Sequence, residues 1–162
     1  MRSTLTVITR SPDETRSVGR ALGEGAQMGD LLLLSGTLGA GKTCLVQGIA
    51  FGMGVPEYAR SPTFVLVNQY AGRLTLFHVD LFRIEDPREA DDLALDECYD
   101  RGVCVVEWAE RARQLFPPQH LWVDITYGRA EDERRLRFRA CGQRYQQLLE
   151  RLRALAHQGG RR

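Results

Sequence analysis

Lysine is almost absent from this chain of 162 residues. Of the 22 lysine and arginine residues only Lys42 is a lysine, so arginine supplies nearly all of the positive charge. Guanine-specific GTPases read their base with an Asn/Thr-Lys-x-Asp motif. Lys42 lies in Gly-Lys-Thr instead, so the chain cannot contain that motif and a guanine-specific switch is excluded.

Long hydrophobic runs and closely spaced cysteines are also missing. No apolar run approaches the roughly 20 residues that a membrane-spanning helix needs, and residues 1–7 have no apolar signal core. We therefore expect a cytoplasmic protein with no membrane partner. The four cysteines, Cys44, Cys98, Cys104 and Cys141, are scattered and lie apart from the three histidines. This spacing suggests buried reduced thiols rather than a zinc site or a disulfide framework.

The segment Gly36-Thr37-Leu38-Gly39-Ala40-Gly41-Lys42-Thr43 matches the G-x-x-x-x-G-K-[ST] pattern of a phosphate-binding loop. An apolar run at 31–34 predicts a buried strand before it, and residues 43–53 predict a helix after it. Glycines in the loop permit positive φ angles that turn successive N–H groups inward, and the helix N-terminus favours bound phosphate. We predict that the nucleotide-binding residues here are Leu38, Gly39, Ala40, Gly41, Lys42, Thr43 and Cys44.

The single lysine supports this interpretation. A composition this rich in arginine indicates that arginine replaces lysine wherever a guanidinium serves equally well. A slim ammonium on a flexible stem can reach between two phosphates inside a tight loop, whereas a planar guanidinium is too broad. Lys42 is therefore a predicted catalytic residue, and the hydroxyl of Thr43 is a predicted magnesium ligand.

Strands and helices alternate along the chain. Strands are predicted at 5–9, 31–34, 64–70, 74–80, 103–106, 121–127 and 135–140; helices are predicted from Pro12, at 43–53, from Pro87 and at 143–156. Residues 71–73 form the turn of a hairpin. The pattern predicts an α/β, P-loop NTPase-like three-layer sandwich with a mixed, mostly parallel sheet. We expect one domain over residues 1–162, with a basic C-terminal helix and tail at about 143–162.

Two of the predicted strands end in a carboxylate. Asp80 follows Leu76-Phe77-His78-Val79, and Glu107 follows a continuous apolar run at 103–106. In folds of this kind the ligand lies beyond the carboxyl ends of the strands. A strand-end acid there can hold magnesium or its water shell, or orient the attacking water. Asp80 and Glu107 are therefore predicted catalytic residues and metal ligands.

Charge is unevenly distributed along the chain. Residues 80–101 carry nine acids against three arginines, and residues 129–162 carry ten arginines against four acids. Such asymmetry can mark a surface for a protein or nucleic-acid partner, and a solvated arginine-rich face explains it equally well. Both interpretations stay open from the sequence.

Four motifs in order resemble the TsaE family of bacterial P-loop ATPases, which act in threonylcarbamoyladenosine modification of tRNA. They are the glycine loop, Ser61-Pro62-Thr63, Asp80-Leu81-Phe82-Arg83 and Glu107-Trp108. The resemblance implies ATP and Mg²⁺ as cofactors, a catalytic role for Thr63 in a switch-like loop, and Trp108 beside the nucleotide. It also implies that Ser11 and Thr15 approach the adenine. The implied partners are TsaB- and TsaD-type proteins, with tRNA a possible indirect partner; whether the chain contacts tRNA directly stays open from the sequence.

The chain departs from the family pattern at four positions. The family usually has an acid at Thr37, a threonine at Cys44, a tyrosine at Phe82 and a proline at Ala109. The first two leave the backbone loop intact, although a thiol is a poorer hydrogen-bond donor to the α-phosphate than a hydroxyl.

Four functions are compared on this basis. The leading prediction is an ATP-binding, slowly hydrolysing ATPase that works with the tRNA-modification proteins. A small-molecule or nucleoside kinase is the alternative, because an isolated P-loop domain of this size is also typical of kinases. A guanine-specific switch is excluded by the single lysine, and Glu107 argues against a scaffold that binds ATP without hydrolysing it.

Overall fold

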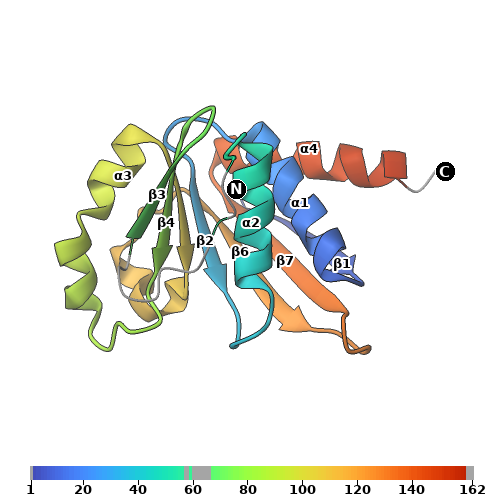
Figure 1. Ribbon diagram of the computed structural model, residues 1–162, viewed down its shortest axis with the longest axis horizontal. Helices are drawn as coiled ribbons and strands as arrows, with labels where there is room; N and C mark the ends of the chain where they lie inside the picture. Colours follow the sequence, from blue (N-terminus) through green and yellow to red (C-terminus); the bar gives the residue numbers. More distant parts are fainter. Residues whose placement is uncertain (1, 57–58, 60–66, 160–162) are drawn as a thin grey trace.

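The structure is a computed structural model, and it describes residues 2–56, 59 and 67–159. One sheet of seven strands runs through the molecule in the order β1-β7-β6-β2-β5-β4-β3 (Figure 1). The strands are β1 (Arg2–Thr9), β2 (Leu31–Ser35), β3 (Val67–Ala71), β4 (Thr75–Asp80), β5 (Val103–Glu107), β6 (His120–Tyr127) and β7 (Arg134–Cys141). The helices are α1 (Pro12–Gly25), α2 (Lys42–Gly52), α3 (Leu95–Arg101) and α4 (Gln143–Gly159), with 3-10 segments η1 (Pro87–Leu93) and η2 (Ala109–Leu115).

The sheet is mixed and mostly parallel, as predicted. β2 pairs in parallel with β5 and β6, and β5 pairs in parallel with β4. β3 and β7 run antiparallel to their neighbours. Since β1 is antiparallel to β7, it points the same way as β6, so only β3 and β7 oppose the other strands.

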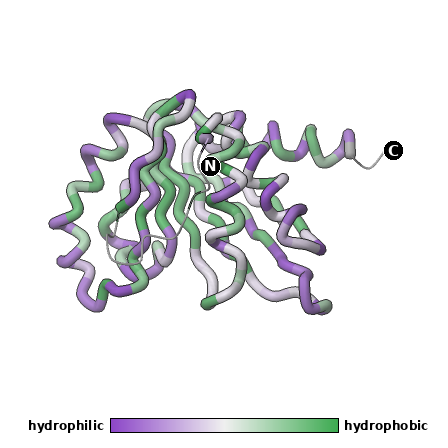
Figure 2. Tube along the Cα trace, viewed as in Figure 1, coloured by the Kyte–Doolittle hydropathy of each residue, from purple (hydrophilic) through white to green (hydrophobic). Residues whose placement is uncertain are grey.

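Helices cover the sheet on both faces, which confirms the three-layer arrangement. The alternating side chains Leu32 and Leu34 of β2 belong to one apolar cluster, with α1, α2 and α4. Leu31 and Leu33 belong to a second cluster, with η1, α3 and η2. A strand between two apolar layers has no polar face. The central strands are accordingly hydrophobic over most of their length (Figure 2), and β2 and β5 are buried at every residue.

Helix α1 begins as the sequence predicts. Ser11 caps it, its hydroxyl oxygen accepting a hydrogen bond of 3.1 Å from the amide of Glu14, and Pro12 stands in the first turn. The helix then packs very closely on α2 through glycines. A Cβ atom added at Gly19 would lie 2.3 Å from the carbonyl oxygen of Leu45, and one at Gly48 would lie 2.1 Å from that of Arg16. Only glycine permits this approach of the two backbones.

Three predicted elements differ in the structure. The predicted helix after Asp86 is divided in two. It begins as the 3-10 segment η1, and the left-handed residue Ala94, with φ of 50°, separates this segment from α3. The segment η2 was not predicted from the sequence. β1 begins at Arg2, earlier than expected, because it pairs with the whole length of β7. Residues 64–66 of a predicted strand lie outside the described residues. Within the described part of the chain, no helix is long and apolar enough to cross a membrane.

Candidate functional site

The glycine loop connects the end of β2 to the start of α2. Gly39 and Gly41 adopt positive φ angles of 78° and 109°, as the pattern predicts for a loop that turns its amides inward. Gly41 is the N-cap of α2, so the positive end of the helix faces the loop. The loop geometry and the helix terminus together make a binding site for anionic groups.

The side chain of Lys42 folds back into this loop. Its Nζ atom donates hydrogen bonds to the carbonyl oxygens of Gly36 at 2.5 Å and Thr37 at 2.9 Å. It also lies 4.0 Å from the centre of the Trp108 ring, a cation–π distance. The ammonium is therefore held in the loop by two backbone carbonyl groups and by the face of the Trp108 ring. Among the described residues, no carboxylate forms an ion pair with it.

Burial lowers the pKa of Lys42 from its ordinary value, because a charged ammonium is poorly solvated there. The negative charges of Glu107, Glu110 and Asp80 oppose this shift and favour the charged form. The pKa of Glu110, on the neighbouring segment η2, is raised, chiefly because part of its solvent is lost. The site thus collects several acids around one buried ammonium.

The two strand-end acids lie side by side. Asp80 and Glu107 are register partners at the ends of the parallel strands β4 and β5. Oε1 of Glu107 accepts a hydrogen bond of 3.0 Å from the hydroxyl of Thr43, and Oδ1 of Asp80 accepts one of 2.9 Å from the amide of Phe82. The structure therefore brings both predicted acids to the first turn of α2.

His78 is a residue of this site that the sequence reasoning missed. It lies two positions before Asp80 on the same face of β4, is fully buried, and its Nε2 atom is hydrogen-bonded to Oε2 of Glu107. Nδ1 has no partner within the described residues. The Glu107 carboxylate is thus held on one oxygen by His78 and on the other by Thr43. A polar residue within a buried apolar strand was the only sequence signal for it.

These groups line one cavity of about 280 Å³. Its lining comprises Leu38, Gly39, Gly41, Lys42, Thr43, Cys44, Asp80, Phe82, Glu107 and Trp108. All of these except Phe82 are predicted site residues. The rings of Phe82 and Trp108 lie 5.0 Å apart and form an aromatic wall. The indole of Trp108 borders both the cavity and the Lys42 ammonium.

A second cavity, of about 160 Å³, adjoins the glycine loop on the side of α1. It is lined by Pro12, Thr15, Gly39, Gly41, Cys44, Asp132 and Arg134. The predicted residue Thr15 therefore lies beside the loop, buried, with its hydroxyl 2.7 Å from that of Thr9. Ser11 caps α1 and does not line the cavity. Ala40, also predicted, is buried beneath the loop, and its carbonyl oxygen accepts a 3.1 Å hydrogen bond from Nε of Arg134.

Two further residues fix the loop from β6 and β7. The hydroxyl of Tyr127 donates a hydrogen bond of 3.0 Å to the carbonyl oxygen of Leu38, and Arg134 binds Ala40 as described. The guanidinium of Arg134 also lies over the Tyr127 ring, 4.4 Å from its centre. No local motif points to either residue, because both contact the loop only through the fold. Thr63 lies outside the described residues.

The donor set fits magnesium. The Thr43 hydroxyl and the carboxylates of Asp80 and Glu107 are hard oxygen ligands, which Mg²⁺ prefers, and it commonly completes its shell with water and substrate phosphates. Among the described residues, no cluster of three or more His, Cys, Asp or Glu side chains could hold a metal ion. The residues therefore suit a metal that arrives with phosphate groups.

Comparison with known proteins gives consistent results. The family model described as threonylcarbamoyl adenosine biosynthesis protein TsaE matches residues 9–136. The TsaE protein of Bacillus subtilis (strain 168) is 41% identical over 146 residues, covering 89% of this chain and 90% of that protein. The TsaE protein of Treponema pallidum is 42% identical over 119 residues, 73% of this chain and 88% of its own length.

The fold agrees with these relatives. The crystal structure of Bacillus subtilis YdiB superposes with a TM-score of 0.81 at 35% sequence identity, covering 96% of this chain and 98% of that chain. The matched residues 9–136 include the glycine loop, Asp80 and Glu107. The chain belongs to the TsaE family of threonylcarbamoyl adenosine biosynthesis proteins.

Proposed function

We propose that this protein binds ATP with Mg²⁺ and hydrolyses it slowly, in the service of tRNA threonylcarbamoyladenosine biosynthesis. The observation that supports this most directly is the convergence of Lys42, Thr43, Asp80 and Glu107 on one cavity beside the glycine loop. The names of the relatives support the pathway. TsaB- and TsaD-type proteins are the proposed partners, and the cytoplasm is the proposed location.

The glycine loop and Lys42 carry the binding role in this proposal. Inward amides and the N-terminus of α2 would receive the phosphates. Lys42 would exchange the carbonyl oxygens of Gly36 and Thr37 for phosphate oxygens, which are stronger partners because they are charged. Thr15, which lines the adjoining cavity, would approach the adenine end of the ligand, as the family resemblance implies.

Glu107 carries the hydrolytic role. The buried Glu107 carboxylate would orient a water molecule well, because two hydrogen bonds, from His78 and Thr43, already set its position. Asp80, its register partner, would share the magnesium and its water shell. The metal, when bound, supplies charge stabilisation at the transferring phosphate.

Slow turnover is expected from the isolated chain. Where an arginine finger completes a phosphoryl-transfer site, the rate rises by about 10³–10⁵. A partner arginine, or an ordered switch around Thr63, could supply the missing charge here. This part of the proposal comes from the family resemblance and from the sequence, since residues 60–66 lie outside the described part of the chain.

An ATPase assay with and without the two partner proteins tests the proposal. We expect weak hydrolysis by the chain alone and a clear increase on adding the partners. Thr63→Ala should reduce that increase more than it reduces ATP affinity. The kinase alternative predicts no response to the partners. A phosphorylated small molecule, formed by the chain alone in step with ATP loss, would overturn the ATPase assignment.

A further inference from the structure

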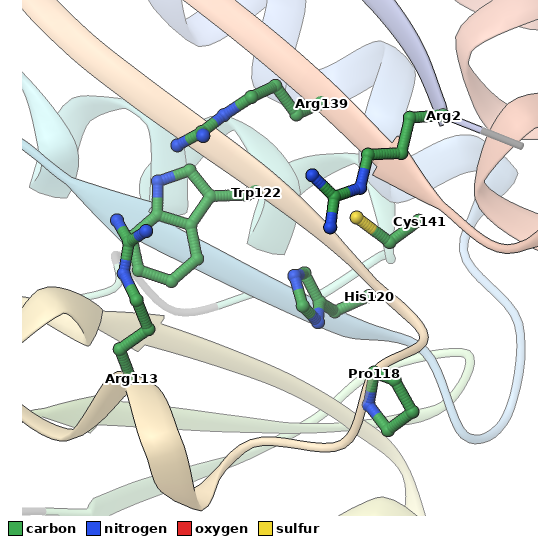
Figure 3. Close-up of a pocket in the computed structure, with 7 residues that line it drawn as sticks. All are labelled: Arg2, Arg113, Pro118, His120, Trp122, Arg139 and Cys141. Carbon is green, nitrogen blue, oxygen red and sulfur yellow. The ribbon is translucent and has the colours of Figure 1, made fainter.

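A separate cavity lies at the opposite ends of the strands from the glycine loop. The loop is held by Tyr127, at the end of β6, whereas His120 begins that strand. The two residues stand roughly 23 Å apart at about 3.3 Å per residue of strand. Around His120 the structure has a separate cavity of about 250 Å³, whose lining includes Arg2, Arg113, Trp122 and Arg139 (Figure 3).

Three strand ends and one 3-10 segment build this cavity. Cys141 is the register partner of both Arg2 in β1 and His120 in β6, and Arg139 is that of Trp122. Paired residues of neighbouring strands project from the same face. η2 then brings Arg113 over the Trp122 ring, 4.2 Å from its centre. Figure 3 shows these side chains grouped around one space.

The cavity opens toward β1 and β7, the part of this face of the sheet that none of the described helices covers. Helices α1 and α4 pack on the other side of β1 and β7. Along β7, Arg135, Arg137 and Arg139 project from this side and alternate with Leu136, Phe138 and Ala140, which are buried under the helices on the other side. We call Arg2, Arg135, Arg137 and Arg139 the open arginine face. All are exposed except Arg139, which is half-buried. Asp124 is the one acid among the strand residues of β1, β6 and β7 that share this face.

The positive charge of this face is largely uncompensated. Arg139 forms an ion pair of 2.8 Å with Asp124, and its Nε atom is buried without a hydrogen-bond partner among the described residues. In the part of the chain that the structure describes, Arg2, Arg113, Arg135 and Arg137 form no ion pair. The arginines of α4 differ, because Arg144, Arg151 and Arg153 pair with Asp30, Glu24 and Glu150. The basic C-terminal half thus carries arginines on α4 that are paired with acids, and arginines on β7 of which only Arg139 forms an ion pair among the described residues.

We propose that this cavity binds a phosphate group, presented by the backbone of an RNA or by a free phosphate compound. Guanidinium forks suit phosphate oxygens, and Trp122 holds the Arg113 guanidinium in a fixed place by stacking. Arginines recur at every second residue of β7, about 6.8 Å apart, so charge continues beyond the cavity. A row of cations beside aromatic rings favours a polyanion such as single-stranded RNA over one carboxylate.

Two measurements test the site on the full chain. The first is fluorescence anisotropy with a short labelled single-stranded RNA, repeated with saturating ADP and Mg²⁺ so that the glycine loop is occupied. The second is a titration with inorganic phosphate in the Trp108→Phe variant, where Trp122 is the single remaining tryptophan. RNA that binds while phosphate alone has little effect identifies the RNA backbone as the source. A Trp122 response to phosphate without tighter RNA binding identifies a free phosphate compound.

Arg2→Gln and Arg113→Gln are the test variants, and Arg151→Gln on α4 is the control with the same change of charge. Arg2 is exposed, so its replacement does not endanger folding. Each lost contact should weaken RNA binding about fivefold at 0.1 M salt. The slope of the logarithm of the binding constant against the logarithm of the salt concentration should become shallower by about 0.7. The phosphate response of Trp122 should weaken in the Arg113→Gln variant. Absence of binding, an equal loss in the Arg151→Gln control, or equally tight arginine-dependent binding of polyglutamate would overturn the proposal.

Discussion

The hydroxyl of Thr43 donates a hydrogen bond of 3.0 Å to Oε1 of Glu107, joining the first turn of α2 to the end of β5. The two residues are 64 positions apart in the chain. One supplies the hydroxyl that a P-loop offers to magnesium, and the other supplies the carboxylate proposed to orient water. Their contact brings together the two groups to which we assign the proposed metal-binding and hydrolytic roles.

Replacement of Glu107 by glutamine should separate binding from hydrolysis. The amide keeps the shape but loses the charge, so we expect ATP affinity close to that of the parent and turnover reduced by about 10²-fold or more. Calorimetric titration and a phosphate-release assay measure the two quantities. Glu110→Gln, on the neighbouring segment η2, is the control and should cost much less. A loss confined to binding would give Glu107 a structural role.

Lys42→Ala should abolish productive ATP binding, and Lys42→Arg should be nearly as damaging. The space between the carbonyl oxygens of Gly36 and Thr37 accepts a point charge, whereas a guanidinium fork is wider. Isothermal titration with ATP and Mg²⁺ checks both variants. Near-native affinity and turnover in the arginine variant would remove the argument from the chain's single lysine.

His78→Leu should lower turnover more than it lowers ATP affinity, because one oxygen of the buried Glu107 carboxylate loses its partner. Loss of a hydrogen bond to a charged group should also reduce the free energy of unfolding by about 1.5–3 kcal/mol. His78→Gln offers an N–H in a similar place and should restore part of the turnover. Steady-state kinetics and chemical denaturation give these values. Equal turnover in the leucine and glutamine variants would show that His78 only fills space.

Asp80→Asn should shift the magnesium dependence of the ATPase reaction to higher concentrations and reduce turnover with it. The amide keeps an oxygen that can accept the Phe82 N–H but loses the negative charge that attracts the metal. A magnesium titration at fixed ATP measures the shift, with Asp86→Asn, an exposed helix-capping residue, as the control. A titration curve matching the parent's would mean that Asp80 is not a metal ligand.

Gly48→Ala should destabilise the fold although it lies outside the cavity. Its Cβ would lie 2.1 Å from the carbonyl oxygen of Arg16, so α1 and α2 would have to separate. We expect a loss of about 2–4 kcal/mol in the free energy of unfolding, as for overpacked or strained interior positions. Thermal and urea denaturation measure it. Ser17→Ala, an exposed change on α1, should leave stability nearly unchanged.

The sequence determined the parts of the site that depend on short spacing. The glycine loop is contiguous, so its conformation follows from where glycine permits positive φ. Asp80 and Glu107 were predictable together for a related reason. Each ends an apolar strand, and the ends of parallel strands meet at one edge of the sheet. Neither motif, however, predicts the order of the strands. The sequence therefore did not show that these two acids are direct register partners.

The tertiary structure alone decided the contacts between distant residues. His78 reaches Glu107, and Arg134 reaches Ala40 across 94 positions, because strand order and register bring them together. The division of the arginines has the same origin. Those of α4 pack where acids of α1 and the α1–β2 turn are within reach. Arg135, Arg137 and Arg139 of β7 instead project from the side of that strand opposite to α1 and α4, where none of the described helices covers it. Composition fixes how many charges a chain carries, and only the fold decides which of them are neutralised.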